Sequence, residues 1–154
     1  MIEKNPIRAL SSINEPIEYG KSFSRGVKVG LRGINMIFIS GTASIDEKGK
    51  TFCPGNFSAQ LKRTFGNISA LLKSSGANWQ DIVQTRCYLK NMKRDYAEFN
   101  LIRNKFYKEQ GLKFFPSSVC VEANLCRPEL LVEIEALAIL EFKRKKSRTP
   151  LKGS

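Results

Sequence analysis

The stretch "CRPELLVEIEALAIL", residues 126–140, contains the most informative structural pattern of the sequence. Its second half alternates as a β-strand does, and both of its faces are largely apolar. One face collects Val132, Ile134, Ala136, Ala138 and Leu140, and the other collects Leu131, Glu133, Glu135, Leu137 and Ile139. The pattern predicts a long strand bound for a hydrophobic core, with two glutamates in the middle of its second face.

The second face of this strand needs a cover, because it is too apolar to be left in water. We expect helices to cover the first face and a neighbouring subunit to cover the second. Glu133 and Glu135, buried between subunits, would then need hydrogen bonds or a cation, which makes them candidates for a functional site. Alternatively, both glutamates lie near the rim of the face and pair with Lys or Arg. Strand geometry leaves both interpretations open.

Three further strands are predicted by alternation and turn residues. Residues 22–33, "SFSRGVKVGLRG", and residues 35–41, "NMIFISG", are expected to pair as an antiparallel hairpin, with Gly41 ending the second strand. Residues 81–91 follow later as a strand rich in β-favouring side chains. One of its faces is predicted to collect Val83, Thr85, Cys87 and Leu89, and the other Ile82, Gln84, Arg86 and Tyr88.

Two helices are predicted by apolar residues at helical spacing. Residues 55–76 have Asn56 as a plausible N-cap and Gly76 at a suitable stop position. Residues 94–111 form the second helix, which Gly111 ends. The buried stripes are expected to be Phe57, Leu61, Phe65, Ile68 and Leu72 in the first helix and Phe99, Ile102 and Phe106 in the second.

Strands at 117–125 and 129–142 complete the order β-β-α-β-α-β-β. This order predicts an α+β domain with two helices on one face of a mixed sheet. At 154 residues, the chain is long enough for one such domain. We expect the domain to span 19–142, between an N-terminal lead-in at 1–18 and a basic, disordered tail at 143–154.

Composition narrows the possible chemistry. The chain has no histidine, which excludes Ser-His and Cys-His dyads and His-ligated zinc, and we expect neither a metal nor a cofactor. Its four cysteines show no CxxC spacing, and the N-terminus has no continuous apolar segment like that of a signal peptide. Together with the absence of a membrane-spanning apolar run, these features predict a cytoplasmic protein with reduced thiols.

The net charge of +12 is unevenly distributed. Residues 143–154 hold six basic residues and no acidic ones, which leaves +6 on the rest of the chain. The tail has no aromatic residues for stacking, so charge alone would give only weak, salt-sensitive attraction to RNA. Specific recognition of nucleic acid is not expected.

The segments "NMIFISG", "YAEFN", "FFPSSVCVE" and "LLVEIEAL" resemble the reactive intermediate deaminase family, also called the RidA, YjgF or L-PSP endoribonuclease family. The resemblance extends from about Phe23 to Leu140 and implies the chorismate-mutase-like α+β fold. It also implies a homotrimer with ligand clefts between subunits. In typical members, a glutamate positions water to hydrolyse an imine or enamine, and an arginine grips the substrate carboxylate.

Matching the family pattern residue by residue implies roles for particular positions. The glutamate falls on Glu133, a family cysteine on Cys120, the helix asparagine on Asn100 and the strand glycine on Gly41. The carboxylate-binding arginine falls on Ser118, which has neither its charge nor its fork of donors. The N-terminal family segment "YSQ" reads "FSR" here, so Phe23 replaces a phenol and Arg25 adds a cation.

A subgroup resemblance adds Cys126 as a second catalytic candidate beside Glu133. "SFSRG", "SGTASIDEKG" and "CRPELLVEIEALAIL" resemble the C-terminal half of chorismatases, in which a cysteine lies seven residues before the glutamate. Cys126 and Glu133 have this spacing, although Cys126 could equally be a packing residue. Arg25, Arg86 and Arg127 are the candidates to replace the missing carboxylate anchor, and Arg86 could instead pair structurally with Glu133 or Glu135.

Three functions remain in competition. The first is a RidA-family enzyme acting on a small carboxylate, by imine hydrolysis or a related hydrolytic or lyase step. The second is a trimer that binds a small ligand without chemistry, which the Ser118 departure favours. The third is the ribonuclease activity attached to the family name, which ranks last because the chain has no histidine.

Overall fold

The computed structural model describes residues 1–141, which form one six-stranded sheet and two long helices. The strand order is β1-β2-β3-β6-β4-β5, with β4 and β5 parallel and every other neighbouring pair antiparallel. The strands are β1 (Glu3–Ile7), β2 (Gly26–Leu31), β3 (Ile34–Ala43), β4 (Ile82–Leu89), β5 (Ser117–Glu122) and β6 (Val132–Glu141), and the helices are α1 (Phe57–Ser74) and α2 (Met92–Glu109).

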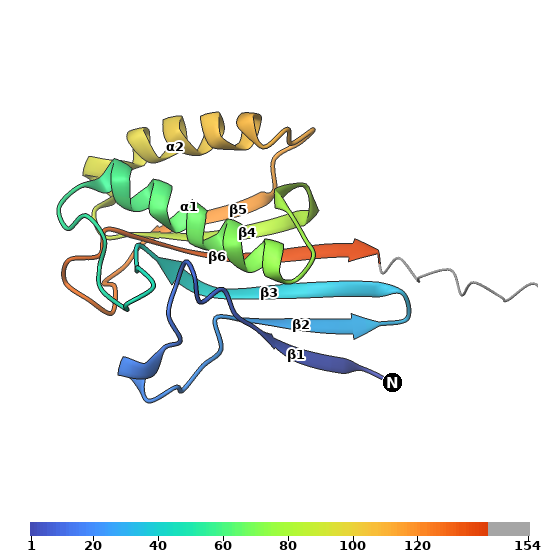
Figure 1. Ribbon diagram of the computed structural model, residues 1–154. Helices are drawn as coiled ribbons and strands as arrows, with labels where there is room; N and C mark the ends of the chain where they lie inside the picture. The colour runs from blue at the N-terminus through green and yellow to red at the C-terminus, as the bar shows by residue number, and fades with distance from the viewer. Residues whose placement is uncertain (142–154) are drawn as a thin grey trace, which may run out of the picture.

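Both helices lie on the same face of the sheet, with β1 at one edge and β5 at the other (Figure 1). The mixed α+β architecture is therefore confirmed, as is the β2–β3 hairpin. No helix within residues 1–141 is both long and apolar enough to cross a membrane. The predicted disordered tail at 143–154 lies outside the described residues.

The N-terminal lead-in contributes an edge strand that the sequence pattern did not predict. Glu3–Ile7 pairs antiparallel with β2, and of its five residues only Ile7 is buried. Charged residues and Pro6 interrupt the apolar alternation by which a strand is predicted from sequence. An edge strand tolerates both, because one side of its backbone needs no partner and its exposed face needs no apolar side chains.

Helix α1 begins and ends as its sequence indicates. The Asn56 side chain accepts a hydrogen bond from the Ala59 N–H at 2.9 Å, and Gly76, just after the helix, has a φ of 83°. Such a conformation is open to glycine and strained for most other residues. All five residues of the predicted stripe are buried, so α1 is the main cover of the sheet.

Helix α2 packs on the sheet and on α1 through aromatic residues. Phe99 is fully buried, whereas Ile102 and Phe106 are partly buried and Tyr107 is buried in their place. The Phe106 and Phe65 rings stack with centroids 4.4 Å apart, and Trp79 meets Phe106 edge to face. This cluster fixes α2 above β4 and β5.

Two β-bulges change the predicted strand faces. In β4 an extra residue at Val83 interrupts the pairing with β6, so Ile82 is buried on the face of Thr85 and Cys87 and Val83 is exposed, whereas strict alternation placed Val83 on that face and Ile82 on the other. In β3 the bulge lies at Ser40 and Gly41, and the strand continues to Ala43 instead of ending at Gly41. A bulge adds one residue and so inverts the alternation beyond it.

The sheet face opposite the helices is open. As predicted, β6 turns Val132, Ile134, Ala136 and Ala138 into the core, and its glutamates lie on the other side. We call this other side the open face; its apolar residues include Phe38, Val119, Val121, Leu137 and Ile139. Glu133 therefore belongs to a surface on which no segment within residues 1–141 packs as a second layer.

Candidate functional site

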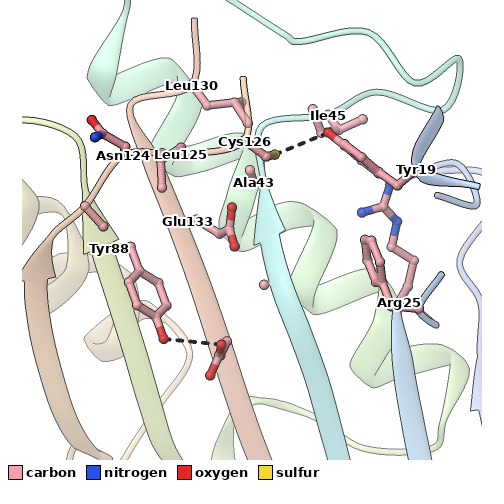
Figure 2. A pocket seen from close by; sticks show the side chains of 14 residues that line it. Tyr19, Arg25, Ala43, Ile45, Tyr88, Asn124, Leu125, Cys126, Leu130 and Glu133 are labelled. Atoms are coloured by element: carbon pink, nitrogen blue, oxygen red, sulfur yellow. Dashed lines mark hydrogen bonds between the residues drawn. The ribbon is translucent and has the colours of Figure 1, made fainter. Parts of the chain in front are cut away.

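A pocket of about 390 Å³ lies on the open face where β3 and β6 meet the loop that precedes β6. It brings together five of the residues singled out in the sequence: Phe23, Arg25, Gly41, Cys126 and Glu133. Figure 2 shows the Glu133 carboxylate pointing into it between the strands, with Cys126 above and Arg25 across from it. The N-terminal segment closes one side with Tyr19, and β4 closes the other with Tyr88.

Glu133 is half-buried and accepts no hydrogen bond from any residue within 1–141. Burial raises the pKa of its carboxyl, the charge of Glu135 raises this pKa further, and Arg25 offsets part of the effect. A carboxyl group with a raised pKa and no fixed partner can hold a water molecule or exchange a proton with a ligand.

Gly41 makes room for the Glu133 carboxylate. A Cβ at Gly41 would lie 2.1 Å from Oε1 and 2.9 Å from Cδ of Glu133, well inside contact distance. The reason for glycine here is thus the close approach of a side chain from the neighbouring strand, which the β3 bulge brings alongside.

Arg25 is a buried cation on the pocket wall. Only 4% of it is exposed, and its Nε and one terminal nitrogen donate to the backbone and side-chain oxygens of Asn14 at 2.8 and 3.0 Å. It stands 5.6 Å from the centre of the Phe23 ring. Burial lowers its pKa, and no carboxylate within residues 1–141 forms an ion pair with it. This cation is available to a bound anion.

Tyr19 is a pocket residue that sequence reasoning missed. Its hydroxyl lies 3.2 Å from the Cys126 Sγ and accepts a hydrogen bond from the Arg127 Nε at 2.9 Å, which leaves the phenolic proton free for the sulfur. Burial and the contact with Cys126 raise the Tyr19 pKa. The phenol expected at position 23 is thus present in the pocket, supplied from four residues upstream.

Arg127 does not line the pocket; it braces the wall. Its guanidinium forms an ion pair with Glu18 and donates to the Gly49 carbonyl oxygen at 2.8 Å, in addition to holding Tyr19. The N-terminal segment is thereby fixed to the loops at the mouth of the pocket. Of the three arginines that were candidates to bind the ligand carboxylate, Arg127 instead binds groups of the protein itself.

Arg86 is likewise paired within the chain. Its guanidinium lies 3.4 Å from a carboxylate oxygen of Glu135, and the Tyr88 hydroxyl donates to the other oxygen at 3.3 Å. This is the structural pairing that the sequence left open for Arg86. It also shows that the two glutamates differ, because Glu135 has partners on β4 and Glu133 has none within residues 1–141.

Two buried amides on α1 hold the flanks of the pocket. Asn67 donates to the carbonyl oxygens of Ala43 and Ile45 at 3.0 and 2.8 Å, at the end of β3. Gln60 accepts from the Leu131 N–H at 2.9 Å and donates to the Glu129 carbonyl oxygen at 2.9 Å, just before β6. Both side chains are fully buried, so the helix fixes the spacing of the strands that carry the site.

The remaining predicted residues lie elsewhere, between α2 and the edge strand β5. Ser118 accepts a hydrogen bond from the Thr85 hydroxyl at 3.1 Å and another, also at 3.1 Å, from Arg103. Arg103 also donates to the Asn100 Oδ1 at 2.6 Å. Cys120 lies on the same face of β5 as Ser118, and burial raises its pKa to about 11. Sequence reasoning missed Arg103, although its three-residue spacing from Asn100 places both on one helix face.

Comparison with known proteins gives a consistent result. The endoribonuclease L-PSP family matches residues 14–140. A RutC family protein from Pyrococcus abyssi is 33% identical over 119 residues, which cover 77% of this chain and 87% of that protein. The 2-iminobutanoate/2-iminopropanoate deaminase of Escherichia coli (strain K12) is 29% identical over 132 residues, 86% of this chain and 97% of that enzyme.

A solved structure supports the same assignment. The YjgF gene product from E. coli superposes with a TM-score of 0.72 at 26% identity, over 91% of this chain and 99% of that one. The family match covers more than half of the sequence, and the fold agrees with it. The chain therefore belongs to the endoribonuclease L-PSP family, which is the RidA/YjgF family that its sequence resembles.

Proposed function

We propose that this protein hydrolyses imines or enamines of small carboxylic acids in the pocket around Glu133. The observation that carries the proposal is the Glu133 carboxyl group, which has a raised pKa, no partner within residues 1–141 and a buried cation across the pocket. The E. coli relative named for 2-iminobutanoate and 2-iminopropanoate supports this choice of substrate class.

In the proposed reaction, Glu133 accepts a proton from water as the water oxygen bonds to the imine carbon. Glu133 passes this proton to the nitrogen, which gives a carbinolamine. The hydroxyl proton of this adduct then moves to the nitrogen as the carbon–nitrogen bond breaks and the carbonyl group forms, so ammonia and a keto acid leave. Arg25 offers a positive charge to the carboxylate within the pocket, and the Tyr19 hydroxyl and Cys126 thiol shape its far wall. The chemistry requires one water and no redox partner.

The oligomeric state forms part of the proposal. The pocket lies on the open face, whose apolar residues are exposed in a single chain. A homotrimer, as the family resemblance implies, would cover this face and turn the pocket into a cleft between subunits, from which water is largely excluded.

The test is ammonia release from 2-aminoacrylate-type imines generated in situ. We expect Glu133→Gln to lose on the order of 100-fold or more in kcat, because a general base contributes at least that much. Glu109→Gln, which removes an exposed carboxylate on α2, is the matched control and should match wild type. Equal turnover by Glu133→Gln and wild type, or no turnover by a correctly assembled wild-type protein, would refute the proposal.

The pH profile of the same assay gives a second readout. Glu133 acts as a base only when ionised, so activity should fall as the pH drops through its pKa. Because the pocket raises this pKa above its ordinary value of 4.5, the acidic limb should lie above pH 4.5. Loss of this limb in Glu133→Gln would assign it to the carboxyl group.

A second candidate is a chorismatase-like lyase or hydrolase reaction on a cyclic carboxylate. The pocket does bring Cys126, seven residues before Glu133, to the same cavity as the glutamate. Incubation with chorismate, followed by chromatography of the products, separates this reaction from deamination. Carboxylate binding with no turnover of either substrate would instead favour a ligand-binding protein.

A further inference from the structure

Arg103 is a cation outside the pocket that is held by two hydrogen bonds. One turn after Asn100 on α2, it reaches the edge strand and donates to the Asn100 Oδ1 at 2.6 Å and to the Ser118 hydroxyl at 3.1 Å. Its guanidinium carbon stands 4.7 Å from the centre of the Phe99 ring, which is fully buried. Its Nε is also buried and has no hydrogen-bond partner among residues 1–141. The guanidinium group is thus held by two hydrogen bonds and also stacks on the Phe99 ring.

No carboxylate among residues 1–141 neutralises the charge of Arg103. Arg63, Arg86, Arg94 and Arg127 each form an ion pair, whereas Arg103 forms none with any residue from 1 to 141. Its two partners are a neutral amide and a hydroxyl. A partly buried guanidinium with neutral partners keeps its full attraction for an anion, and its fixed orientation lowers the entropy cost of binding one.

The surroundings of Arg103 favour a small organic anion. The Cys87 thiol lies 3.9 Å from the Ser118 hydroxyl that Arg103 contacts, and burial raises the pKa of the thiols of Cys87 and Cys120, a rise that the charge of Arg103 opposes. Cys87 and Phe99 are buried in the core, so the partly exposed Cys120 gives the site its apolar lining. A planar carboxylate with a short apolar substituent fits the fork of donors and this lining.

We propose that Arg103, aligned by Asn100 and Ser118, is a carboxylate-binding residue. The inference deepens the proposed function and rests on it for the identity of the ligand. Ser118 occupies the position where the family resemblance places the anchoring arginine, and here a guanidinium reaches that serine from α2. The guanidinium group is thus supplied by helix α2 instead of strand β5.

Arg103 and Glu133 cannot meet one ligand within a single chain. Strand β4 lies between β5 and β6, which places the strands about 10 Å apart. Moreover, Arg103 lies on the helix side of the sheet and Glu133 on the open face. A substrate held by both therefore lies where two copies of the chain meet.

Binding of pyruvate, a keto acid of the product class, tests the site directly by calorimetric titration. Arg103→Gln should weaken binding at least about tenfold, the usual effect of losing a charged hydrogen bond. Arg103→Lys keeps the charge and should recover part of the loss. Lys105→Gln removes a charge from the same helix and should bind as wild type does. Equal affinity of wild type and a folded Arg103→Gln variant would overturn the proposal.

Kinetics separate this inference from the proposed function. If both hold, Arg103→Gln raises KM for the imine, whereas Glu133→Gln lowers kcat and still binds pyruvate. Arg103-dependent pyruvate binding by a wild type without turnover would refute only the deaminase function. Turnover with an unchanged KM in Arg103→Gln would refute only the role of Arg103.

Mixed assemblies test whether the two residues serve one ligand. Refolding Arg103→Gln and Glu133→Gln chains together gives contacts in which one copy supplies Arg103 and the other supplies Glu133. At an imine concentration well below the KM of Arg103→Gln, we expect these assemblies to turn over faster than either variant does alone. No recovery in assemblies shown by mass spectrometry to be mixed would overturn the shared site.

Discussion

At the scale of single residues, the site depends on Gly41, which has no side chain. Gly41 leaves the space that the Glu133 carboxylate occupies, and a Cβ there would fall 2.1 Å from Oε1. The atom that must give way is the end of a flexible side chain, so the fold can accommodate the change while the carboxylate moves. Position 41 thus controls where the carboxylate points with little effect on the backbone.

We therefore expect Gly41→Ala to lower kcat/KM for imine hydrolysis on the order of 100-fold, since displacing a catalytic group by about 1 Å costs that much. Its Tm should stay close to that of wild type. Gly66→Ala is the control, because a Cβ at Gly66 on α1 meets nothing within 4 Å. A Gly41→Ala variant with full activity would show that the Glu133 position is not critical.

At the scale of elements, α1 acts as a brace for the pocket as well as a cover for the core. Gln60 and Asn67 are fully buried amides on the largely apolar buried side of this helix, and each satisfies backbone groups of the segments that lead into or out of the site. Buried amides of this kind fix relative positions because any other arrangement leaves polar groups without partners.

Replacing Gln60 by Met keeps the volume and removes its hydrogen bonds to Leu131, Glu129 and Cys53. We expect a loss of about 2–5 kcal/mol in the free energy of unfolding, because buried backbone groups would remain unsatisfied. Urea denaturation measures this loss, with Gln110→Met, at the exposed end of α2, as the control. A variant as stable as wild type would mean that water replaces the amide.

At the scale of the whole molecule, the open face is an apolar surface that is exposed in a single chain. Phe38 and Ile139 are 45% and 39% exposed on neighbouring strands, and the pocket opens on the same side. Burial of this face between copies would stabilise an assembly and enclose the site. The proposed activity and the proposed homotrimer are therefore linked through one surface.

Phe38→Asp should break this assembly, because it would bury an unpaired charge between subunits. Light scattering should give three times the chain mass of 17.4 kDa for wild type and the mass of one chain for the variant. Lys48→Asp, a charge change in the exposed turn after β3, is the control. A monomeric wild type, or a trimeric Phe38→Asp variant, would contradict the prediction.

Local sequence patterns were sufficient to predict the order of the elements between Gly26 and Glu141, the N-cap at Asn56, the buried stripe of α1 and the face of β6 on which Glu133 lies. These features follow from local periodicity and turn chemistry, which neighbouring residues specify. The sequence also pointed to Glu133, Cys126, Arg25, Phe23 and Gly41, which the pocket brings together.

Features that depend on contacts between distant segments could be recognised only in the folded chain. The bulges in β3 and β4 come from pairing with β6, and β1 is a strand only because β2 offers it an edge. Tyr19 reaches the pocket across 107 residues to Cys126, and Arg103 reaches Ser118 from another element. The same chemical group can be supplied from a different position in the chain and still occupy the same place in the fold. Sequence patterns show the position in the chain and do not show the place in the fold.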